Sequence, residues 1–401
     1  MAKKIPQNVG MGKSPALLPK KKGQQRRSDV LVQIVIAVLL CLIYIFYALS
    51  FDVKGEKYIK GDCYYYRAVI ISILHDGDFY LNNNIDRPLD SGDLALGKAR
   101  DPERLVPKHP IIMPIFSLPF FAALGSIGLL IFNIMQTVLL FMVIYRLNRL
   151  FFDSGVSFAG SMLFGTVTLF FNYSFNYSPD VFSTLLFVSG LYFVLAKKYG
   201  WGAVCLGLSI FAKLPNALLV VMVCLYVTQD ILCSDRWEKP LNPKGGKQKK
   251  RTLLKFFTIL FIALIPVALA NTVLYGSPWT TGYSRAFGMN DHLDTFNQPL
   301  VKGFVRQLFD GEKGLLTTNP ILLVSLLGLF IAPARRFRIP FDFIFLLCLA
   351  QLLFFAKYDY WRASHFSNRF LMITVALLSV FASSPIAFLA NKLKDRKKVL
   401  S

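Results

Sequence analysis

The chain has 401 residues, and 54% of them are hydrophobic, a share above that of ordinary soluble domains. Its mean hydropathy is +0.49, and several apolar runs reach the roughly 20 residues that a helix needs to cross a bilayer. A soluble globular protein is therefore excluded. The composition predicts an all-α fold, a polytopic bundle of membrane helices.

The formal net charge of +22 is unevenly distributed along the chain. In the topology given below, one side of the membrane holds 28 of the 45 Lys and Arg and 7 of the 23 acids, whereas the other side holds 16 of each. Such an excess is typical of cytoplasmic loops in membrane proteins. The charge therefore indicates an orientation in the bilayer, and no nucleic-acid partner is expected.

The first part of the chain alternates between a basic tail, a span and a long loop. Residues 1–29 are basic and lack apolar periodicity, which predicts a disordered cytoplasmic tail. The first span covers 30–51, and the first outer loop follows at 52–110. Within this loop, apolar residues at 64–74 recur with helical spacing, which predicts a short helix on the membrane surface.

The remaining apolar runs divide at polar or helix-breaking residues. We split 111–147 at Gly125, into an interfacial or re-entrant helix and a span, and 201–231 at Lys213-Leu-Pro215. The second split keeps the basic loop 236–251 inside. The other expected spans are 158–171, 181–196, 253–275, 315–332, 340–356 and 370–389, with outer loops at 276–314 and 357–369. The sequence thus predicts about ten spans, a membrane domain over 30–391, a basic tail over 392–401, and both termini in the cytoplasm.

This topology gathers the unusual polar residues on the outer face. They come from several separate loops: Asp62, Asp76, Asp78, His109, Asp180, Lys213, Arg285, Trp361, His365 and Arg369. A chain that only spans the membrane has no need to bring such residues to one side. The pattern predicts a functional site at the outer interface.

Two acidic motifs of the first loop have alternative interpretations. Asp62 precedes three tyrosines, so it is either a general base partly desolvated by aromatic side chains or the cap of the following helix. Asp76-Gly-Asp78 has the form of a metal-binding pair, but the asparagines that follow favour a turn.

Three later positions also have two interpretations each. Asp180 follows Pro179 at the start of a span, where it either caps the helix or orients a substrate. Lys213 lies among apolar residues, where a charge is costly unless it is paired or functional; the alternative is a Lys that snorkels to the interface. The aromatic cluster around Trp361 and Arg369 suits either a sugar phosphate or an interfacial belt.

The ordered motifs resemble the C-type (GT-C) superfamily of membrane glycosyltransferases, which use polyprenyl-phosphate sugars. The similarity is greatest to bacterial relatives of protein O-mannosyltransferases and lipid A aminoarabinose transferases. The segments that carry it are Gly-Asp62-Cys-Tyr-Tyr-Tyr, His75-Asp-Gly-Asp78, Lys108-His-Pro-Ile-Ile-Met-Pro, Tyr-Ser-Pro-Asp180, Gly207-Leu-Ser-Ile-Phe-Ala-Lys213, Tyr275-Gly-Ser-Pro-Trp-Thr-Thr-Gly-Tyr283, Gly314-Leu-Leu-Thr-Thr-Asn-Pro320 and Trp361-Arg-Ala-Ser-His-Phe-Ser-Asn-Arg369.

The resemblance implies an inverting glycosyltransferase in a bacterial inner membrane, with its site on the periplasmic face. Asp62 corresponds to the catalytic acid of the first outer loop, and Asp180 to an acidic position of the second. Lys213 and Arg369 are candidates to hold the donor phosphate. Further candidates for substrate binding are Trp361, His365, Tyr65, His109 and Arg285.

The expected partners are a lipid-linked sugar donor, the bilayer, and an acceptor lipid, glycan or protein. No cofactor beyond the donor is required and no metal ligand is assigned, while dependence on a divalent metal stays open. Relatives often carry Asp-Glu where this chain has Asp62-Cys63. Two alternatives therefore remain: a transporter or flippase for lipid-linked sugars, and a scaffold that has kept the fold without the chemistry.

Overall fold

The computed structural model describes residues 22–50, 59, 61–85, 96–101, 103–233, 245–285, 293–331, 338–362 and 366–400. Most of the predicted N-terminal tail and His365 lie outside these residues. The described chain is almost entirely helical. Its only strands, β1 (Leu96–Lys98) and β2 (Leu105–Pro107), form an antiparallel pair in which Leu96 faces Pro107.

The α-helices follow one another along nearly the whole described chain. They are α1 (Lys22–Ser50), α2 (Asp62–His75), α3 (Ile112–Leu124), α4 (Ser126–Asn148), α5 (Ser154–Val167), α6 (Leu169–Tyr173), α7 (Pro179–Leu195), α8 (Tyr199–Ala212), α9 (Asn216–Leu232), α10 (Gly245–Tyr275), α11 (Leu300–Phe309), α12 (Leu315–Thr318), α13 (Leu322–Leu329), α14 (Arg338–Ala356) and α15 (Met372–Leu400). Short 3₁₀ helices occur at η3 (Gly282–Arg285), η4 (Leu293–Phe296), η6 (Asp359–Arg362) and η7 (Arg369–Leu371).

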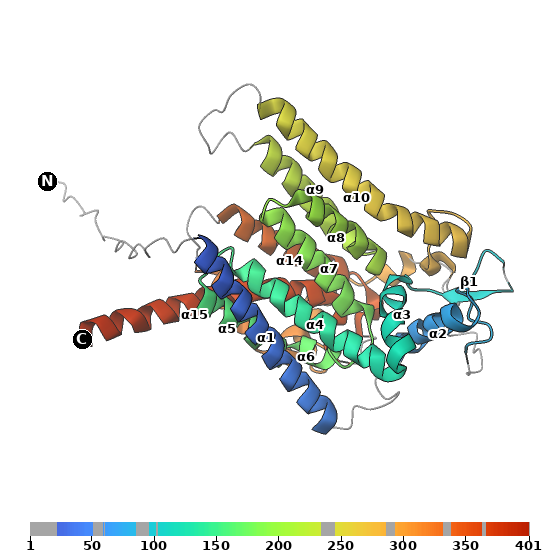
Figure 1. Ribbon diagram of the computed structural model, residues 1–401, viewed down its shortest axis with the longest axis horizontal. Coiled ribbons are helices and arrows are strands. Elements are labelled where there is room, and N and C mark those ends of the chain that lie inside the picture. The colour runs from blue at the N-terminus through green and yellow to red at the C-terminus, as the bar shows by residue number, and fades with distance from the viewer. Residues whose placement is uncertain are drawn as a thin grey trace.

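The long helices form a bundle, and α2 and β1 lie together at one end of it (Figure 1). Among the described residues, α1, α4, α10, α14 and α15 contain segments long and apolar enough to cross a membrane, and α3, α5, α7, α8 and α9 are shorter apolar helices. The prediction of an all-α polytopic membrane protein is confirmed.

Two predicted breaks are confirmed by the helix boundaries. Gly125, with a φ of 58°, ends α3 and precedes α4, because glycine adopts a positive φ without a steric penalty. α8 ends at Ala212 and α9 begins at Asn216, so Lys213 lies in the break between two short helices. The predicted helix at 64–74 is present as α2.

The prediction of one continuous span over 315–332 is wrong. The segment forms α12 and α13, separated at Asn319-Pro320. Pro320 cannot donate a backbone hydrogen bond within a helix, and Asn319 uses its side chain elsewhere, as shown below. A similar interruption at Thr168, whose backbone is extended, separates α5 from α6.

Close helix packing depends on glycine at two interfaces. A Cβ on Gly207 of α8 would lie 2.5 Å from the Cβ of Ala263 on α10. A Cβ on Gly303 of α11 would lie 1.8 Å from the backbone oxygen of Ala356 on α14. Small residues allow the backbones to approach in this way, as is common between membrane helices. α11 is thereby docked at the end of α14 that leads to the last outer loop.

Candidate active site

Asp62 lies in the first turn of α2 and is partly accessible. Its carboxylate accepts a hydrogen bond from Nη2 of Arg369 at 2.7 Å, and Nε2 of His109 lies 3.7 Å away. The cap interpretation of Asp62 is wrong, because Gly61, with a φ of 57°, is the N-cap residue and no side chain caps this helix. The side chain is 26% exposed, so a solute can reach it.

Asp180 also lies near Arg369 and is almost fully buried, with 3% of its side chain exposed. The N-cap of α7 is Ser178, and the hydroxyl of Ser178 donates to Asp180 at 2.5 Å. Lys213 forms an ion pair with the other carboxylate oxygen, and Nε of Arg369 lies 3.8 Å from Asp180. Asp180 is therefore held by charged partners rather than serving as the helix cap.

Arg369 thus contacts two carboxylates, Asp62 and Asp180, which are 118 residues apart in the sequence. We call Asp62, His109, Asp180, Lys213 and Arg369 the ion network. The network connects the start of α2, the segment after β2, the start of α7, the break between α8 and α9, and η7 before α15. A buried charge set of this kind is stabilised only where its members pair.

The segment that carries Arg369 is fixed by hydrogen bonds from distant helices. Ser367 has a φ of 49°, which is unusual for a residue other than glycine. Its hydroxyl contacts Thr318 and Asn319, at 2.7 and 3.0 Å, and the hydroxyl of Tyr173 donates to the carbonyl of Phe366 at 3.0 Å. The guanidinium of Arg369 is therefore positioned by the broken helices α6 and α12.

Asn319 explains why α12 ends where it does. Its amide oxygen accepts from the backbone N–H of Leu169 at 2.6 Å, and its amide nitrogen donates to Ser367. The side chain therefore joins the start of α6 to the Arg369 segment. The interruptions after α5 and α12 leave backbone groups without hydrogen bonds inside a helix. The side chain of Asn319 supplies partners for them, as buried polar groups require.

His109 connects the ion network to η3. Its ring stacks on Tyr66, with ring centroids 5.8 Å apart, and its Nδ1 lies 3.1 Å from the hydroxyl of Tyr283. Burial favours the protonated form of Asp62, but the electrostatic and hydrogen-bonding effects of His109 and Arg369 outweigh it and lower the pKa. The pKa of Asp62 therefore lies below its usual range, and the carboxylate is ionised at neutral pH.

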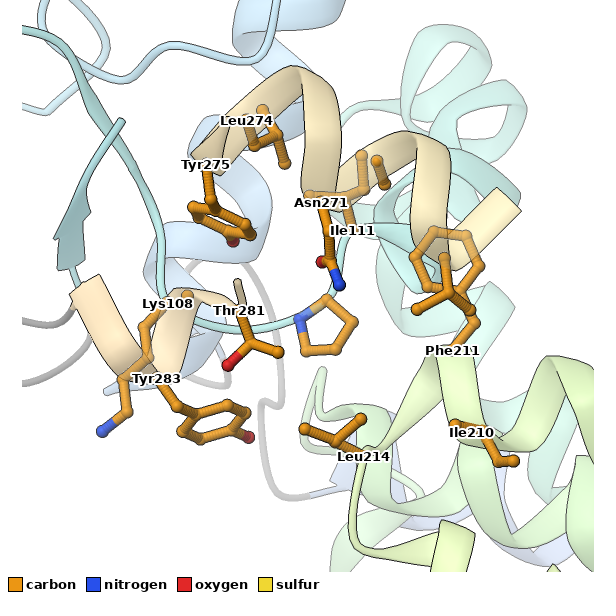
Figure 2. A pocket seen from close by; sticks show the side chains of 14 residues that line it. Lys108, Ile111, Ile210, Phe211, Leu214, Asn271, Leu274, Tyr275, Thr281 and Tyr283 are labelled. Carbon is orange, nitrogen blue, oxygen red and sulfur yellow. The ribbon is translucent and has the colours of Figure 1, made fainter. Parts of the chain in front are cut away.

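An apolar pocket includes direct chain neighbours of the ion network in its lining, and Figure 2 shows the side chains that line it. Its lining comes from the exit of β2, the end of α8, the last turns of α10 and η3: Lys108, Pro110, Ile111, Ile210, Phe211, Leu214, Val267, Ala270, Asn271, Leu274, Tyr275, Thr281, Gly282 and Tyr283. The pocket is narrow, with about 30 Å³ of water-accessible space. Lys108 and Leu214 in this lining are the chain neighbours of His109 and Lys213.

Lys108 is the one cationic residue in this lining. The residue is buried, and its Nζ lies 5.5 Å from the ring centroid of Tyr283. Burial lowers the pKa of Lys108, and the nearby charge of Asp62 partly offsets the effect. Lys108 therefore lies near the charge of Asp62 while it also contributes to the lining of the apolar pocket.

The other residues proposed from the sequence lie apart from the network. Tyr65 is buried in α2 against Tyr64, with ring centroids 5.4 Å apart. Trp361 is buried and Arg285 is exposed. Within the described residues, neither has a hydrogen bond or ion pair with the ion network.

Asp76 and Asp78 belong to a turn. Asp78 accepts from the hydroxyl of Ser72 at 2.7 Å and from the backbone of Tyr80 at 2.9 Å, and Asp76 accepts from the side chain of Asn84 at 2.6 Å. The turn interpretation is confirmed. In the described part of the chain, no group of three His, Cys, Asp or Glu is arranged to hold a metal ion.

Sequence reasoning missed four contributors to this region. Lys108 was quoted only as part of a motif, although its position just before an apolar helix could have marked it. Ser178 stands in a Ser-Pro-Asp helix start, which predicts a cap. No local pattern distinguishes Tyr283 from other interfacial tyrosines, or Asn319 from an ordinary polar residue in an apolar run.

A family model agrees with part of the chain. The model of dolichyl-phosphate-mannose-protein mannosyltransferases matches residues 108–242, which include Lys108, His109, Asp180 and Lys213 and exclude Asp62 and Arg369. No curated protein matches the chain. The sequence comparison therefore concerns the middle of the membrane domain.

Solved structures resemble nearly the whole chain. ArnT from Cupriavidus metallidurans bound to undecaprenyl phosphate is 13% identical, with a TM-score of 0.56, over 92% of this chain and 63% of that protein. The oligosaccharyltransferase of Archaeoglobus fulgidus in the apo form is 11% identical, with a TM-score of 0.60, over 94% and 52%. The chain has the fold of the C-type membrane glycosyltransferases.

The C-type fold also relates the chain to a third structure. Archaeal AglB from Archaeoglobus fulgidus, in complex with an inhibitory peptide and a dolichol-phosphate, is 12% identical, with a TM-score of 0.58, over 93% of this chain and 52% of AglB. The chain spans between about half and two thirds of the length of these proteins. At such identities the likeness concerns the fold, and the predicted resemblance is confirmed at that level.

Proposed function

We propose that the chain transfers a sugar from a polyprenyl-phosphate donor to a hydroxyl group of a lipid, glycan or protein acceptor at the outer face of the membrane. The observation that supports this most is the position of the ion network beside an apolar pocket that contains Lys108. A polyprenyl phosphate combines an apolar chain with an anionic group, and this site offers complementary surfaces for both.

Asp62 is the proposed general base. It is the accessible carboxylate of the network, whereas Asp180 is enclosed by Lys213, Arg369 and Ser178. In the transfer, the acceptor oxygen bonds to the anomeric carbon while the bond from that carbon to the phosphate oxygen breaks. Asp62 takes the proton of the acceptor hydroxyl, and polyprenyl phosphate leaves as an anion. Attack from the opposite face inverts the anomeric configuration.

The cations have different proposed roles. Lys108 is the pocket-lining cation, so it binds the donor phosphate together with Arg369. Lys213 is paired with Asp180 in this structure, so its proposed role changes from holding phosphate to keeping Asp180 ionised. Asp180 in turn orients Arg369, since the guanidinium lies between the two carboxylates.

Donor binding is expected to make Asp62 a stronger base. A carboxylate whose pKa is held low by two cationic neighbours is ionised but weakly basic. When the donor phosphate takes over part of the charge of Arg369, the pKa of Asp62 rises toward its usual range. The base is then activated only while the donor occupies the site.

The test compares two carboxylates of the same loop. Asp62→Asn removes the proposed base, and Asp76→Asn removes a carboxylate that belongs to the turn. Membranes that contain each variant are supplied with a radiolabelled polyprenyl-phosphate sugar, and label transferred to acceptors is measured. We expect Asp62→Asn to lose roughly 10²–10⁴-fold in rate, the usual contribution of a general base, and Asp76→Asn to retain activity.

Full activity of Asp62→Asn would contradict the assignment of the base. The same variant separates the alternatives, since a flippase moves the labelled lipid across the bilayer without producing a labelled acceptor. A scaffold without chemistry gives no product from the wild-type chain either.

A further inference from the structure

A second pocket lies at the end of α10 opposite to the ion network. It is lined by Tyr199, Gly200, Lys247, Gln248, Arg251, Thr252, Lys255 and Phe256 and has about 650 Å³ of water-accessible space. We call it the basic groove. The other end of α10 carries Tyr275, whose hydroxyl donates to the carbonyl of Pro107 beside the apolar pocket. Figure 1 shows α10 extending along the edge of the bundle between these two ends.

The basic groove results from the relative lengths of two parallel helices. A Cβ on Gly200 of α8 would lie 3.4 Å from Ile259 of α10, and one on Gly207 would lie 2.5 Å from Ala263. α8 therefore begins close to the level of Ile259, while α10 begins at Gly245. At 1.5 Å per residue, α10 extends roughly 20 Å past the first turn of α8. The recess beneath this extension is the groove.

Three cations lie along the groove, and the described residues offer them no ionic partner. Lys247, Arg251 and Lys255 are four residues apart, which places them on one face of α10. All three are exposed. They have no hydrogen bond or ion pair among the described residues, and no Asp or Glu occurs in the described lining.

Two neighbouring cations, Lys197 and Lys249, have partners. Lys197 forms an ion pair with Asp230, which also accepts a hydrogen bond from the hydroxyl of Tyr199 at 2.6 Å. Lys249 approaches the carbonyl of Leu232 at the end of α9, at 3.5 Å. An excess of positive charge in this region is enough to orient the protein in the membrane. Orientation does not require that cations without a described partner line the same recess.

The surroundings of the groove are typical of a membrane interface. Trp201, one turn into α8, is 66% exposed, and Leu254 and Phe261 on the outer surface of α10 are also exposed. Tryptophan is enriched where membrane helices meet water. The floor of the groove is the buried ring of Phe256. An amphiphile with an anionic head can therefore enter from the plane of the bilayer.

We propose that the basic groove binds the phosphate headgroup of an anionic membrane lipid. The cations supply charge complementarity to the phosphate, and the exposed apolar face of α10 accommodates the acyl chains. Inorganic phosphate can bind the same cations, but it has no acyl chains and so gains no binding free energy from the apolar face of α10. The experiment therefore compares phosphatidylglycerol, phosphatidylcholine and inorganic phosphate as probes.

The experiment uses the full chain purified in a neutral detergent. The groove variant is Lys247→Gln/Arg251→Gln/Lys255→Gln. The control variant is Lys250→Gln/Lys392→Gln/Lys394→Gln, which removes the same charge from exposed positions of α10 and α15. Native mass spectrometry counts retained lipids, and a titration with fluorescent phosphatidylglycerol measures affinity. Thermal unfolding without added lipid shows that both variants are folded.

We expect the wild-type chain and the control variant to retain phosphatidylglycerol and to release phosphatidylcholine. The groove variant is expected to bind phosphatidylglycerol on the order of a hundredfold more weakly, because each cation near an anionic headgroup changes affinity about fivefold. Equal losses in both triple variants would refute a specific site. Competition by inorganic phosphate as effective as competition by phosphatidylglycerol would refute the lipid as occupant.

Discussion

The ion pair between Lys213 and Asp180 allows a quantitative test of the network. The substitution Lys213→Met keeps an unbranched side chain of similar reach and removes its charge. Asp180, at 3% exposure, then retains only Ser178 and the more distant Arg369. Removing one member of a buried pair costs about 3–5 kcal/mol. Because Arg369 still compensates part of the charge, we expect a loss near the lower end, about 3 kcal/mol.

A double-mutant cycle separates the pair from its surroundings. Asp180→Asn keeps the shape of the side chain and its contact with Ser178, but leaves Lys213 buried without a carboxylate. In Lys213→Met/Asp180→Asn neither charge remains, so the double variant is expected to be more stable than Lys213→Met alone. The expected coupling is about 2 kcal/mol, within the range for contacting residues.

The assay is equilibrium unfolding in mixed SDS and neutral-detergent micelles, with binding of undecaprenyl phosphate as a second measurement. If Lys213 serves Asp180, the double variant regains stability and binds the lipid as tightly as Asp180→Asn alone. A Lys213→Met variant as stable as wild type would refute the energetic argument. Recovered stability with lipid binding clearly weaker than that of Asp180→Asn would instead assign Lys213 to the phosphate.

Three further predictions concern the pocket, the base and helix docking. Lys108→Met should weaken binding of undecaprenyl phosphate roughly tenfold or more, since charged hydrogen bonds contribute about 1.5–3 kcal/mol; unchanged affinity measured by fluorescence titration would contradict its phosphate role. His109→Gln removes positive charge beside Asp62, so the pKa of Asp62 rises and the acid limb of the pH–rate profile moves to higher pH, whereas an unmoved limb would exclude this coupling. Gly303→Ala places a Cβ against the backbone of α14 and should increase hydrogen exchange in α11, while Gly311→Ala, which meets nothing within 4 Å, serves as its control.

Much of the helix pattern follows from local properties of the sequence. Runs of apolar residues with few charges specify membrane helices, and glycine or proline marks several of their ends. The breaks at Gly125 and at Lys213-Leu-Pro215 were predictable for this reason. The break at Asn319-Pro320 was not predicted, because apolar composition continues on both sides and the compensating contacts come from Leu169 and Ser367.

The site was predictable only in part, for a related reason. Placing a charge among apolar residues of a membrane helix costs free energy. The position of Lys213 therefore predicted a paired or functional role. Its partner Asp180 is separated from Lys213 along the chain by α7 and α8, so spacing could not reveal the pair. Sequence reasoning also associated Trp361 with the site because it shares a loop with Arg369. In the structure, Arg369 belongs to the ion network and Trp361 does not.

The role of Asn319 has a consequence for how such a protein can diversify. Arg369 is positioned through Asn319, Ser367 and Tyr173, which belong to the helical scaffold or lie directly beside it. The outer segment between α10 and α12 contributes none of these hydrogen bonds. Residues there that contact neither His109, the apolar pocket nor α14 can therefore change while the guanidinium stays in place. The interruption at Asn319 thus makes the position of Arg369 independent of much of the neighbouring segment.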